Sequence, residues 1–193
     1  YKATVQYGIP TSFASQLSVL GETGRATDSL RLAVVAGAPV SDELMADLSD
    51  RFGTTVLAGY SVTETASTVS VSLPSDSPEQ RRFTVGRPIS GTIVRIVEAA
   101  TEGDVVLPVE SVGEIRVKGP GVMLGYYRQP NQTAESFDAN GFFRTGDLGL
   151  VDEDGFLHLV GRTRDVIIRS GFNVYPREVE SRIESHPAVQ EVA

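Results

Sequence analysis

The sequence predicts an α/β protein that begins with parallel β-α-β units, continues as a mainly β, distorted barrel-like subdomain, and ends in the start of a small α+β domain. Three observations predict this class. Short apolar segments alternate with segments of helical periodicity up to residue 59. Glycine-rich turns then separate short β-type segments, and a helix is expected from Pro176 near the end. Alternation of strands with helices is typical of parallel sheets.

The composition narrows the function classes before any motif is considered. The 193 residues contain no cysteine, which excludes disulfides and thiolate metal sites. The formal net charge is −8 without a basic tract, which disfavours nucleic-acid binding. No apolar run approaches the roughly 20 residues of a membrane span. We therefore expect a cytoplasmic protein, with homo-oligomer formation left open. The absence of an initial Met predicts a fragment.

Residues 1–82 are predicted to form the α/β part of a larger domain. We expect strands over residues 3–9, 30–36 and 54–58, and helices over residues 11–20 and 41–51. Ser41 is the expected N-cap of the second helix, because its hydroxyl can accept from a first-turn amide. Gly59 is expected to end the third strand, and residues 73–82 are predicted to be a polar linker.

Two loops at strand ends carry candidate chemistry, since ligands of open α/β sheets bind beyond the carboxyl ends of the strands. Ala36-Gly37-Ala38-Pro39 has small side chains that let a flat ligand approach the backbone, although it also suits a helix-entry turn. Gly59-Tyr60-Ser61-Val62-Thr63-Glu64-Thr65 offers a Tyr for a purine, a Thr hydroxyl for a phosphate and a Glu for Mg²⁺. An ordinary polar loop is the alternative.

Residues 83–160 are predicted to form the β-rich subdomain. Strands are expected over residues 92–97, 113–118, 148–151 and 156–160, and a short helix that Asn131 caps over residues 130–137. Before the third of these strands, Arg144-Thr145-Gly146-Asp147 predicts a tight turn. A carboxylate fixed in such a turn can accept hydrogen bonds from a vicinal diol such as a ribose. A common surface β-turn is the alternative.

The remaining residues are predicted to form a hinge and the beginning of a C-terminal domain. The hinge covers residues 161–165, Gly161-Arg162-Thr163-Arg164-Asp165, and the domain covers residues 166–193. In this domain a strand over residues 166–168 is followed by Ser170-Gly171-Phe172-Asn173 and by the helix that starts near Pro176.

Several of these motifs together resemble those of the acyl-CoA synthetases of the adenylate-forming superfamily. Those enzymes carry a Thr-Gly-Asp, a Gly-Arg at an interdomain hinge and a Ser-Gly-Phe-Asn-Val-type run, in the order found here from Thr145, Gly161 and Ser170. The segment from Gly59 resembles the Tyr-Gly-x-Thr-Glu motif of the same family, with Ser61 where Gly is usual. The resemblance spans the whole chain, as a middle-to-C-terminal slice of a longer family member.

The resemblance implies a role for each motif residue. Tyr60 would stack on adenine, Thr63 would contact the α-phosphate and Glu64 would hold Mg²⁺, which makes Thr63 and Glu64 the catalytic candidates. The nucleotide-binding set, for ATP or AMP, is Gly37, Ala38, Pro39, Gly59, Tyr60, Ser61, Thr63, Asp147 and Arg162. The hinge set is Arg164 and Asp165, and the coenzyme A set is Ser170, Gly171 and Phe172.

The resemblance also implies a reaction. A carboxylate, such as a fatty acid, and ATP would form an acyl-adenylate, and the thiol of coenzyme A would then displace AMP. The sequence lacks the family's Lys-bearing phosphate loop and its late catalytic Lys, so the isolated chain is expected to be inactive. Two alternatives stay open: an adenylation domain that loads a carrier protein, and a non-catalytic nucleotide-binding α/β module. Carrier-loading domains usually show Lys-Ile-Arg-Gly where this chain has the run from Ser170.

Overall fold

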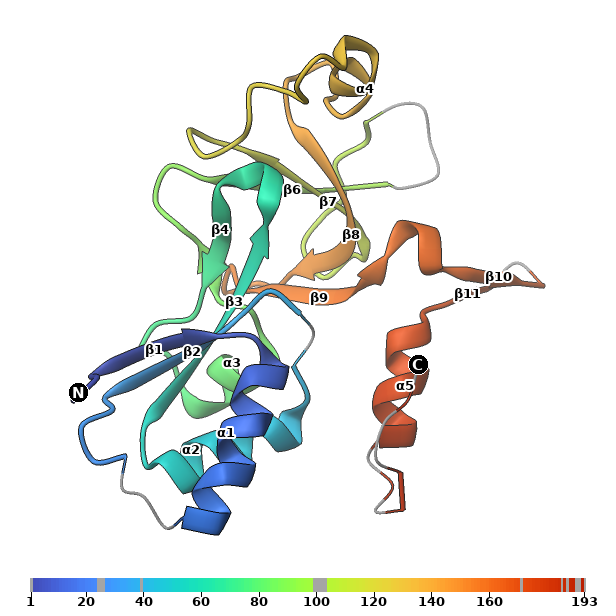
Figure 1. The fold of residues 1–193 in the computed structure, drawn as a ribbon. Helices are drawn as coiled ribbons and strands as arrows, with labels where there is room; N and C mark the ends of the chain where they lie inside the picture. The colour runs from blue at the N-terminus through green and yellow to red at the C-terminus, as the bar shows by residue number, and fades with distance from the viewer. Residues whose placement is uncertain are drawn as a thin grey trace. The chain divides into compact units, whose positions relative to one another are not determined.

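The computed structural model describes residues 2–23, 27–38, 40–98, 104–170, 172–184, 186, 188, 189 and 192 (Figure 1). The chain divides into two compact units, Tyr1–Ser90 and Gly91–Ala193. Within the ranges above, no helix is long and apolar enough to cross a membrane. The domain boundaries that the sequence suggests after residues 82, 160 and 165 stay predictions.

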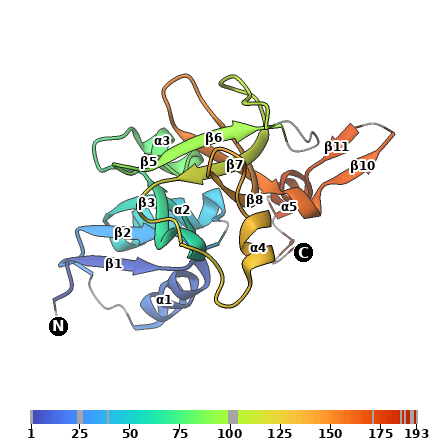
Figure 2. The same cartoon turned by 90° about the horizontal axis from the view of Figure 1, so that it is seen from above.

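A five-stranded sheet, in the order β1-β2-β3-β4-β5, forms the first unit together with three helices (Figure 2). Its elements are β1 (Val5–Gly8), α1 (Pro10–Thr23), β2 (Leu32–Val35), α2 (Asp42–Phe52), β3 (Thr55–Val62), the 3₁₀ turn η1 (Thr63–Thr65), β4 (Ser67–Val71), α3 (Pro78–Phe83) and β5 (Arg87–Pro88). β1, β2 and β3 are parallel, and β4 and β5 are antiparallel to their neighbours. The predicted parallel β-α-β units are confirmed.

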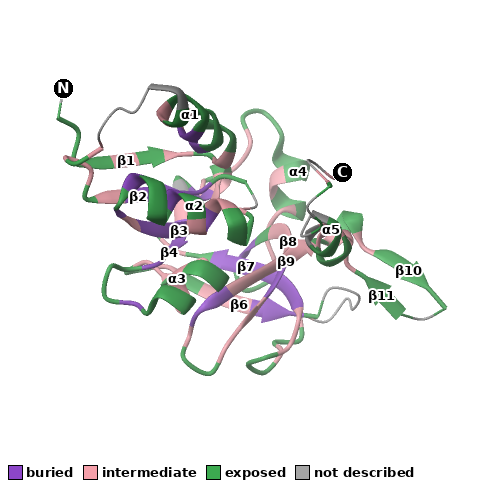
Figure 3. Cartoon of the chain, turned by 90° about the horizontal axis from the view of Figure 1, so that it is seen from below, coloured by how far each residue is buried: buried purple, intermediate pink, exposed green. Residues whose placement is uncertain are grey.

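α1 and α2 supply the hydrophobic core on one face of this sheet, and β2 and β3 are largely buried (Figure 3). The buried core residues are Phe13, Leu17, Ala33, Val35, Met45, Leu48, Phe52, Val56 and Ala58. The strand members are two residues apart because alternate side chains of a strand share a face. Burial of each large side chain contributes about 1.5–3 kcal/mol. This packing fixes the carboxyl ends of β2 and β3 beside each other.

Two predictions for the helices of this unit can be compared with the structure: one is confirmed and the other is wrong. Ser41 accepts a hydrogen bond from the Leu44 amide at 3.2 Å, as an N-cap should. The predicted linker over residues 73–82, in contrast, contains most of α3. This helix forms because Ser77 and Gln80 exchange side-chain and backbone hydrogen bonds in a capping box.

The end of β3 also differs from the prediction. The strand does not stop at Gly59 but continues to Val62, because residues 59–62 pair with the antiparallel strand β4. The predicted loop from Gly59 to Thr65 is therefore half strand and half 3₁₀ turn. Tyr60 is buried in the strand part, and Thr63 and Glu64 lie in the turn that joins β3 to β4.

The second unit contains a four-stranded antiparallel sheet, in the order β6-β7-β8-β9, and a separate hairpin of β10 and β11. Its elements are β6 (Ile93–Val97), β7 (Gly113–Lys118), α4 (Pro130–Glu135), β8 (Phe143–Val151), β9 (Leu157–Arg162), the 3₁₀ turn η2 (Thr163–Asp165), β10 (Ile167–Arg169), β11 (Phe172–Val174) and α5 (Pro176–Glu184). The predicted mainly β part and the following α+β segment are confirmed. The strands described form an open sheet and not a closed barrel, which corrects the barrel-like detail.

Two local predictions for this unit are also corrected. α4 begins at Pro130, and its N-cap position is Gln129, whose side chain makes no capping bond, so Asn131 is not the cap. Residues 145–147 do not form a free turn but a bulge inside β8. Glu114 pairs with Leu148 and Arg116 with Arg144, so that Ile115 alone faces three residues of β8. Bulges of this kind bend a strand and redirect its side chains.

One buried cation lies at the centre of this sheet. The Arg116 side chain is only 2% exposed and contacts three carboxylates, those of Asp104, Glu114 and Asp138. Burial alone would lower the pKa of Arg116, but these carboxylates hold its pKa above the ordinary value. Burial alone would raise the pKa of Asp138, but backbone amides and Arg116 hold that pKa below its ordinary value. Arg116 and Asp138 are therefore both charged at neutral pH.

Candidate functional site

The carboxyl ends of β2 and β3 bring together the small residues that the sequence singles out in the first unit. Ala36 follows β2, and its Cβ would lie 3.6 Å from a Cβ placed on Gly59. Gly37 has φ of +85°, a conformation that favours glycine, and both Gly37 and Ala38 are exposed. Pro39 and Gly171, two of the predicted site residues, lie outside the described residues.

The hydroxyl and carboxylate candidates of the first unit lie in η1. Thr63 is exposed and Glu64 is half-buried, and the neighbouring Thr65 anchors the turn by donating to the Val62 carbonyl at 2.9 Å. Among the residues described, no group of three or more acidic, His or Cys side chains could hold a metal. A single Glu64 still fits Mg²⁺, because this ion is usually held by one or two carboxylates together with substrate phosphates and water.

Asp147 and Arg162 form the candidate site of the second unit. They are direct partners across β8 and β9, and Arg162 Nε lies 3.2 Å from Asp147 Oδ1. The Asp147 side chain is 16% exposed and the Arg162 side chain 55% exposed. An ion pair with this much solvent contributes about 0–1 kcal/mol to stability. The sequence predicts both residues at a ribose, and the fold places them side by side in one surface position.

The backbone of the bulge is held by side chains rather than by the sheet ladder alone. Thr145 Oγ1 donates to the Ile115 carbonyl at 2.6 Å and accepts from the Asp147 amide at 3.1 Å. Gly146, with φ of +71°, donates its amide to Glu114 Oε1 at 3.3 Å and accepts from Thr163 Oγ1 at 2.6 Å. These four contacts determine where the bulge points the Asp147 side chain.

Sequence reasoning missed Glu114, Arg116 and Thr163. Glu114 belongs to the buried cluster around Arg116, and it also reaches Gly146. The only signal for Glu114 and Arg116 is a pair of opposite charges two residues apart in a strand, which usually indicates a solvent-facing side. Thr163 lies between two arginines in the predicted hinge, and nothing in the sequence distinguishes its hydroxyl.

The hinge candidates and the coenzyme A candidates follow Arg162 closely in the sequence. Their described side chains are more exposed than that of Asp147. The Arg164 side chain is 75% exposed and lies 3.5 Å from the Asp165 carboxylate. Ser170 has φ of +52° at the tip of the β10–β11 hairpin, and Phe172 is exposed in β11. Figure 3 shows both strands of this hairpin exposed along their length.

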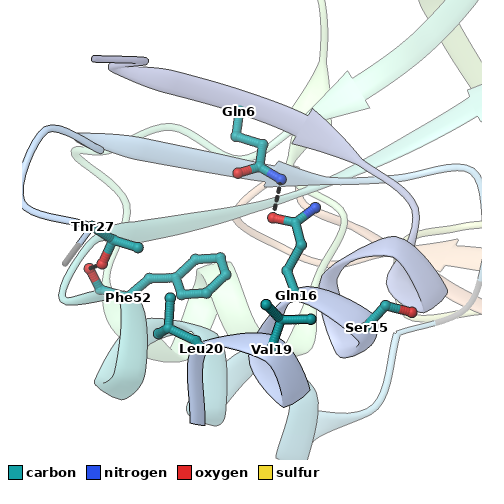
Figure 4. A pocket seen from close by; sticks show the side chains of 7 residues that line it. All are labelled: Gln6, Ser15, Gln16, Val19, Leu20, Thr27 and Phe52. Carbon is teal, nitrogen blue, oxygen red and sulfur yellow. Dashed lines mark hydrogen bonds between the residues drawn. The ribbon is translucent and has the colours of Figure 1, made fainter. Parts of the chain in front are cut away.

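A groove in the first unit lies apart from the predicted residues. It encloses about 310 Å³ and is lined by Gln6, Ser15, Gln16, Val19, Leu20, Thr27 and Phe52 (Figure 4). Gln6 Nε2 donates to Gln16 Oε1 at 2.5 Å across it. None of the lining residues belongs to the nucleotide-binding set, so this groove does not coincide with the candidate site.

The fold and the motifs define an α/β protein of the adenylate-forming superfamily. The sequence profile of the AMP-binding enzyme family matches residues 1–127, more than half of the chain. The chain therefore belongs to the family of AMP-binding enzymes.

Relatives and solved structures agree with this assignment. The mitochondrial medium-chain acyl-CoA ligase ACSF2 of Macaca fascicularis is 35% identical over 187 residues, which are 96% of this chain and 30% of that protein. ATP-bound MatB from Rhodopseudomonas palustris has a TM-score of 0.88 and 37% identity, over 98% of this chain and 37% of MatB. The O-succinylbenzoate coenzyme A synthetase MenE of Bacillus subtilis, in complex with ATP and a magnesium ion, has a TM-score of 0.83 and 36% identity, over 98% of this chain and 38% of MenE. The chain thus spans about a third of the length of these relatives.

Proposed function

We propose that this chain is part of an ATP-dependent, AMP-forming acyl-CoA ligase that converts a fatty acid or related carboxylate into its coenzyme A thioester. The observation that carries the proposal is the Asp147–Arg162 pair on the β8 bulge, at the position of the Thr-Gly-Asp motif. ATP in the MatB complex, ATP and magnesium in the MenE complex, and the acyl-CoA ligase activity named for ACSF2 support it. The predicted cytoplasmic location and homo-oligomer formation stay predictions.

In the proposed first step, a carboxylate oxygen of the substrate attacks the α-phosphorus of ATP and pyrophosphate leaves. Asp147 accepts hydrogen bonds from the two ribose hydroxyls, and Arg162 lies beside it to contact the same sugar. The exposed Thr63 hydroxyl donates to an oxygen of the α-phosphate. Magnesium, when bound through Glu64, neutralises phosphate charge. In this proposal, each of these residues orients one part of the nucleotide, and the Thr63 hydroxyl stabilises charge that develops at phosphorus.

In the proposed second step, the sulfur of coenzyme A attacks the acyl carbon of the adenylate, and AMP leaves with the bonding electron pair. The ribose contacts of Asp147 and Arg162 are proposed to hold the AMP moiety in both steps, as part of ATP in the first and as the leaving group in the second. Ser170, Gly171 and Phe172 are proposed to contact coenzyme A, and the exposure of Phe172 is compatible with a surface that meets a large substrate. Residues 161–165 are the proposed hinge between the two states.

The test is an assay of the full-length protein with ATP, Mg²⁺, coenzyme A and saturated fatty acids of graded length. We expect AMP and acyl-CoA to appear in equal amounts. Adenylate formation without thioester, followed by acyl transfer to an added phosphopantetheinyl carrier protein, would instead assign the chain to the carrier-loading class. Binding of AMP without any turnover would assign it to a non-catalytic nucleotide-binding module.

The isolated 193-residue chain is expected to form no acyl-adenylate. It contains the proposed AMP side of the site, but it lacks both family lysines, which stabilise charge at the leaving pyrophosphate and at the attacking carboxylate. The measurement is pyrophosphate release from the isolated chain, with a boiled sample as the control and the full-length protein as the positive reference. Release above the boiled control would contradict this expectation.

Replacing Arg164 by proline in the full-length enzyme is expected to preserve adenylation and to lower thioester formation. Arg164 lies in η2 with its side chain in water, and proline would fix φ at a position whose backbone must change between the two states. The two steps are followed by pyrophosphate release in a single turnover and by the appearance of acyl-CoA. Arg164→Ala, which removes the same side chain but leaves φ free, is the control. If both steps fall equally, or neither changes, Arg164 is not the pivot.

A further inference from the structure

Gly146 is the point at which the candidate ribose site depends on a second segment of chain. Both backbone polar groups of Gly146 are bound by side chains from other elements. Its amide donates to Glu114 Oε1 of β7 at 3.3 Å, and its carbonyl accepts from Thr163 Oγ1 of η2 at 2.6 Å. The second contact is as short as a strong hydroxyl–carbonyl hydrogen bond.

The bulge needs such contacts because it departs from the regular sheet ladder. Ile115 faces three residues of β8, so pairing with β7 does not fix the backbone there in the usual register. On the other side, β9 pairs with β8 from Asp147 onward but not at Gly146. Gly146 has no side chain that could pack and fix its position. Its φ is +71°, and glycine can adopt this and several other backbone conformations easily. Groups that hold the Gly146 peptide therefore determine the direction of the next side chain, that of Asp147.

Thr163 supplies this contact from a particular place in the chain. It directly follows Arg162, which pairs with Asp147 at 3.2 Å, and directly precedes Arg164 in the proposed hinge. One short segment therefore provides two contacts. Arg162 is the cation beside the Asp147 carboxylate, and Thr163 donates to the carbonyl of the preceding residue, Gly146. The hydrogen bond from Thr163 to Gly146 also connects the proposed hinge to β8, at the residue directly before Arg164.

We infer that Thr163 is a positioning residue for nucleotide binding: its hydroxyl holds the Gly146 carbonyl and thereby directs the Asp147 carboxylate toward the ribose. The inference rests on the proposed function, in which Asp147 binds that sugar. Thr163 is half-buried and does not belong to the hydrophobic core, so its hydroxyl can be removed with little effect on folding. Valine has nearly the shape of threonine without the donor, and serine keeps the donor.

The experiment compares Thr163→Val and Thr163→Ser in the full-length enzyme. We expect Thr163→Val to raise the KM for ATP in the adenylation step by roughly three- to tenfold, the worth of one neutral hydrogen bond, with a smaller change in kcat. Thr163→Ser should restore the wild-type KM. The matched control is Ser136→Ala, which also removes a hydroxyl that donates to a backbone carbonyl in the same unit, that of Gln132 at 2.7 Å, and which should leave the KM unchanged.

Hydrogen–deuterium exchange provides a second readout that does not depend on catalysis. In Thr163→Val the amides of Gly146 and Asp147 should exchange faster, whereas those at the far end of β8 should not. Unchanged exchange and unchanged KM in this variant, with Asp147→Ala still impaired, would overturn the inference and leave the proposed function standing. A different result would be faster exchange in Thr163→Val while neither Thr163→Val nor Asp147→Ala changes the KM for ATP. It would show that the contact orders the bulge but that the bulge does not bind ATP. That result would overturn both proposals.

Discussion

Replacing Asp147 by alanine in the full-length enzyme is expected to lower kcat/KM for ATP by tenfold or more, through weaker binding and slower turnover together. The carboxylate is proposed to accept two hydrogen bonds from the ribose diol. A charge-assisted hydrogen bond contributes roughly 1.5–3 kcal/mol, and each 1.4 kcal/mol corresponds to about a factor of ten. The measurement is the initial rate of pyrophosphate release at varied ATP concentration.

The structure allows the loss of a ligand contact to be separated from a loss of folding. Because the Arg162 side chain is 55% exposed, loss of the Asp147–Arg162 ion pair should itself change stability by no more than about 1 kcal/mol. Thermal unfolding of the variant should therefore resemble that of the wild type. Glu153→Ala, which removes an exposed carboxylate between β8 and β9, is the matched control. Unchanged KM and unchanged turnover in Asp147→Ala would remove this residue from the site.

Replacing Arg116 by methionine is expected to lower the free energy of unfolding by about 3–5 kcal/mol, the typical cost of removing one partner from a buried ion pair. Methionine has a similar length but no charge, so the carboxylates of Glu114, Asp104 and Asp138 would lose the buried cation that they share. The raised pKa of Arg116 and the lowered pKa of Asp138 indicate that both charged forms are favoured by the pairing. Denaturant unfolding of wild type and variant, followed by circular dichroism, measures the difference.

Arg144→Met provides the control for this experiment. Arg144 is the register partner of Arg116 across β7 and β8 and also contacts Asp104, but its side chain is 39% exposed. Because a solvated ion pair contributes about 0–1 kcal/mol, this variant should lose far less stability than Arg116→Met. Equal losses in the two variants would mean that burial of the guanidinium does not determine the effect.

The order of elements and motifs could be predicted from the sequence because these features are local. Ser41 caps α2 through an amide three residues away, and apolar periodicity identifies the parallel strands without knowledge of their partners. The Thr-Gly-Asp and Gly-Arg motifs likewise point to Asp147 and Arg162 from adjacent residues alone. The pairing of Asp147 with Arg162 depends on the register of β8 against β9, and no local sequence pattern predicts that register.

Two of the predictions that were wrong depend on partners distant in sequence. β3 continues past Gly59 only because β4 pairs with it, and residues 145–147 form a bulge only because β7 passes beside them about 30 residues earlier in the chain. The pairing of Arg116 has the same origin in part, since two of its three carboxylate partners, Asp104 and Asp138, come from other segments of the chain. Isolated segments do not contain this information.

The β8 bulge has a consequence for how this part of the chain can vary over evolutionary time. Three β8 residues lie opposite Ile115, two more than in regular pairing. Because side chains alternate between the faces of a strand, deleting one of them would turn every later residue of β8 to the other face, including the buried Leu148. Side chains in the bulge can be exchanged one at a time, but its length cannot change by a single residue without repacking the sheet. Single-codon insertions and deletions should therefore be tolerated less well here than substitutions, even though the bulge lies near the surface.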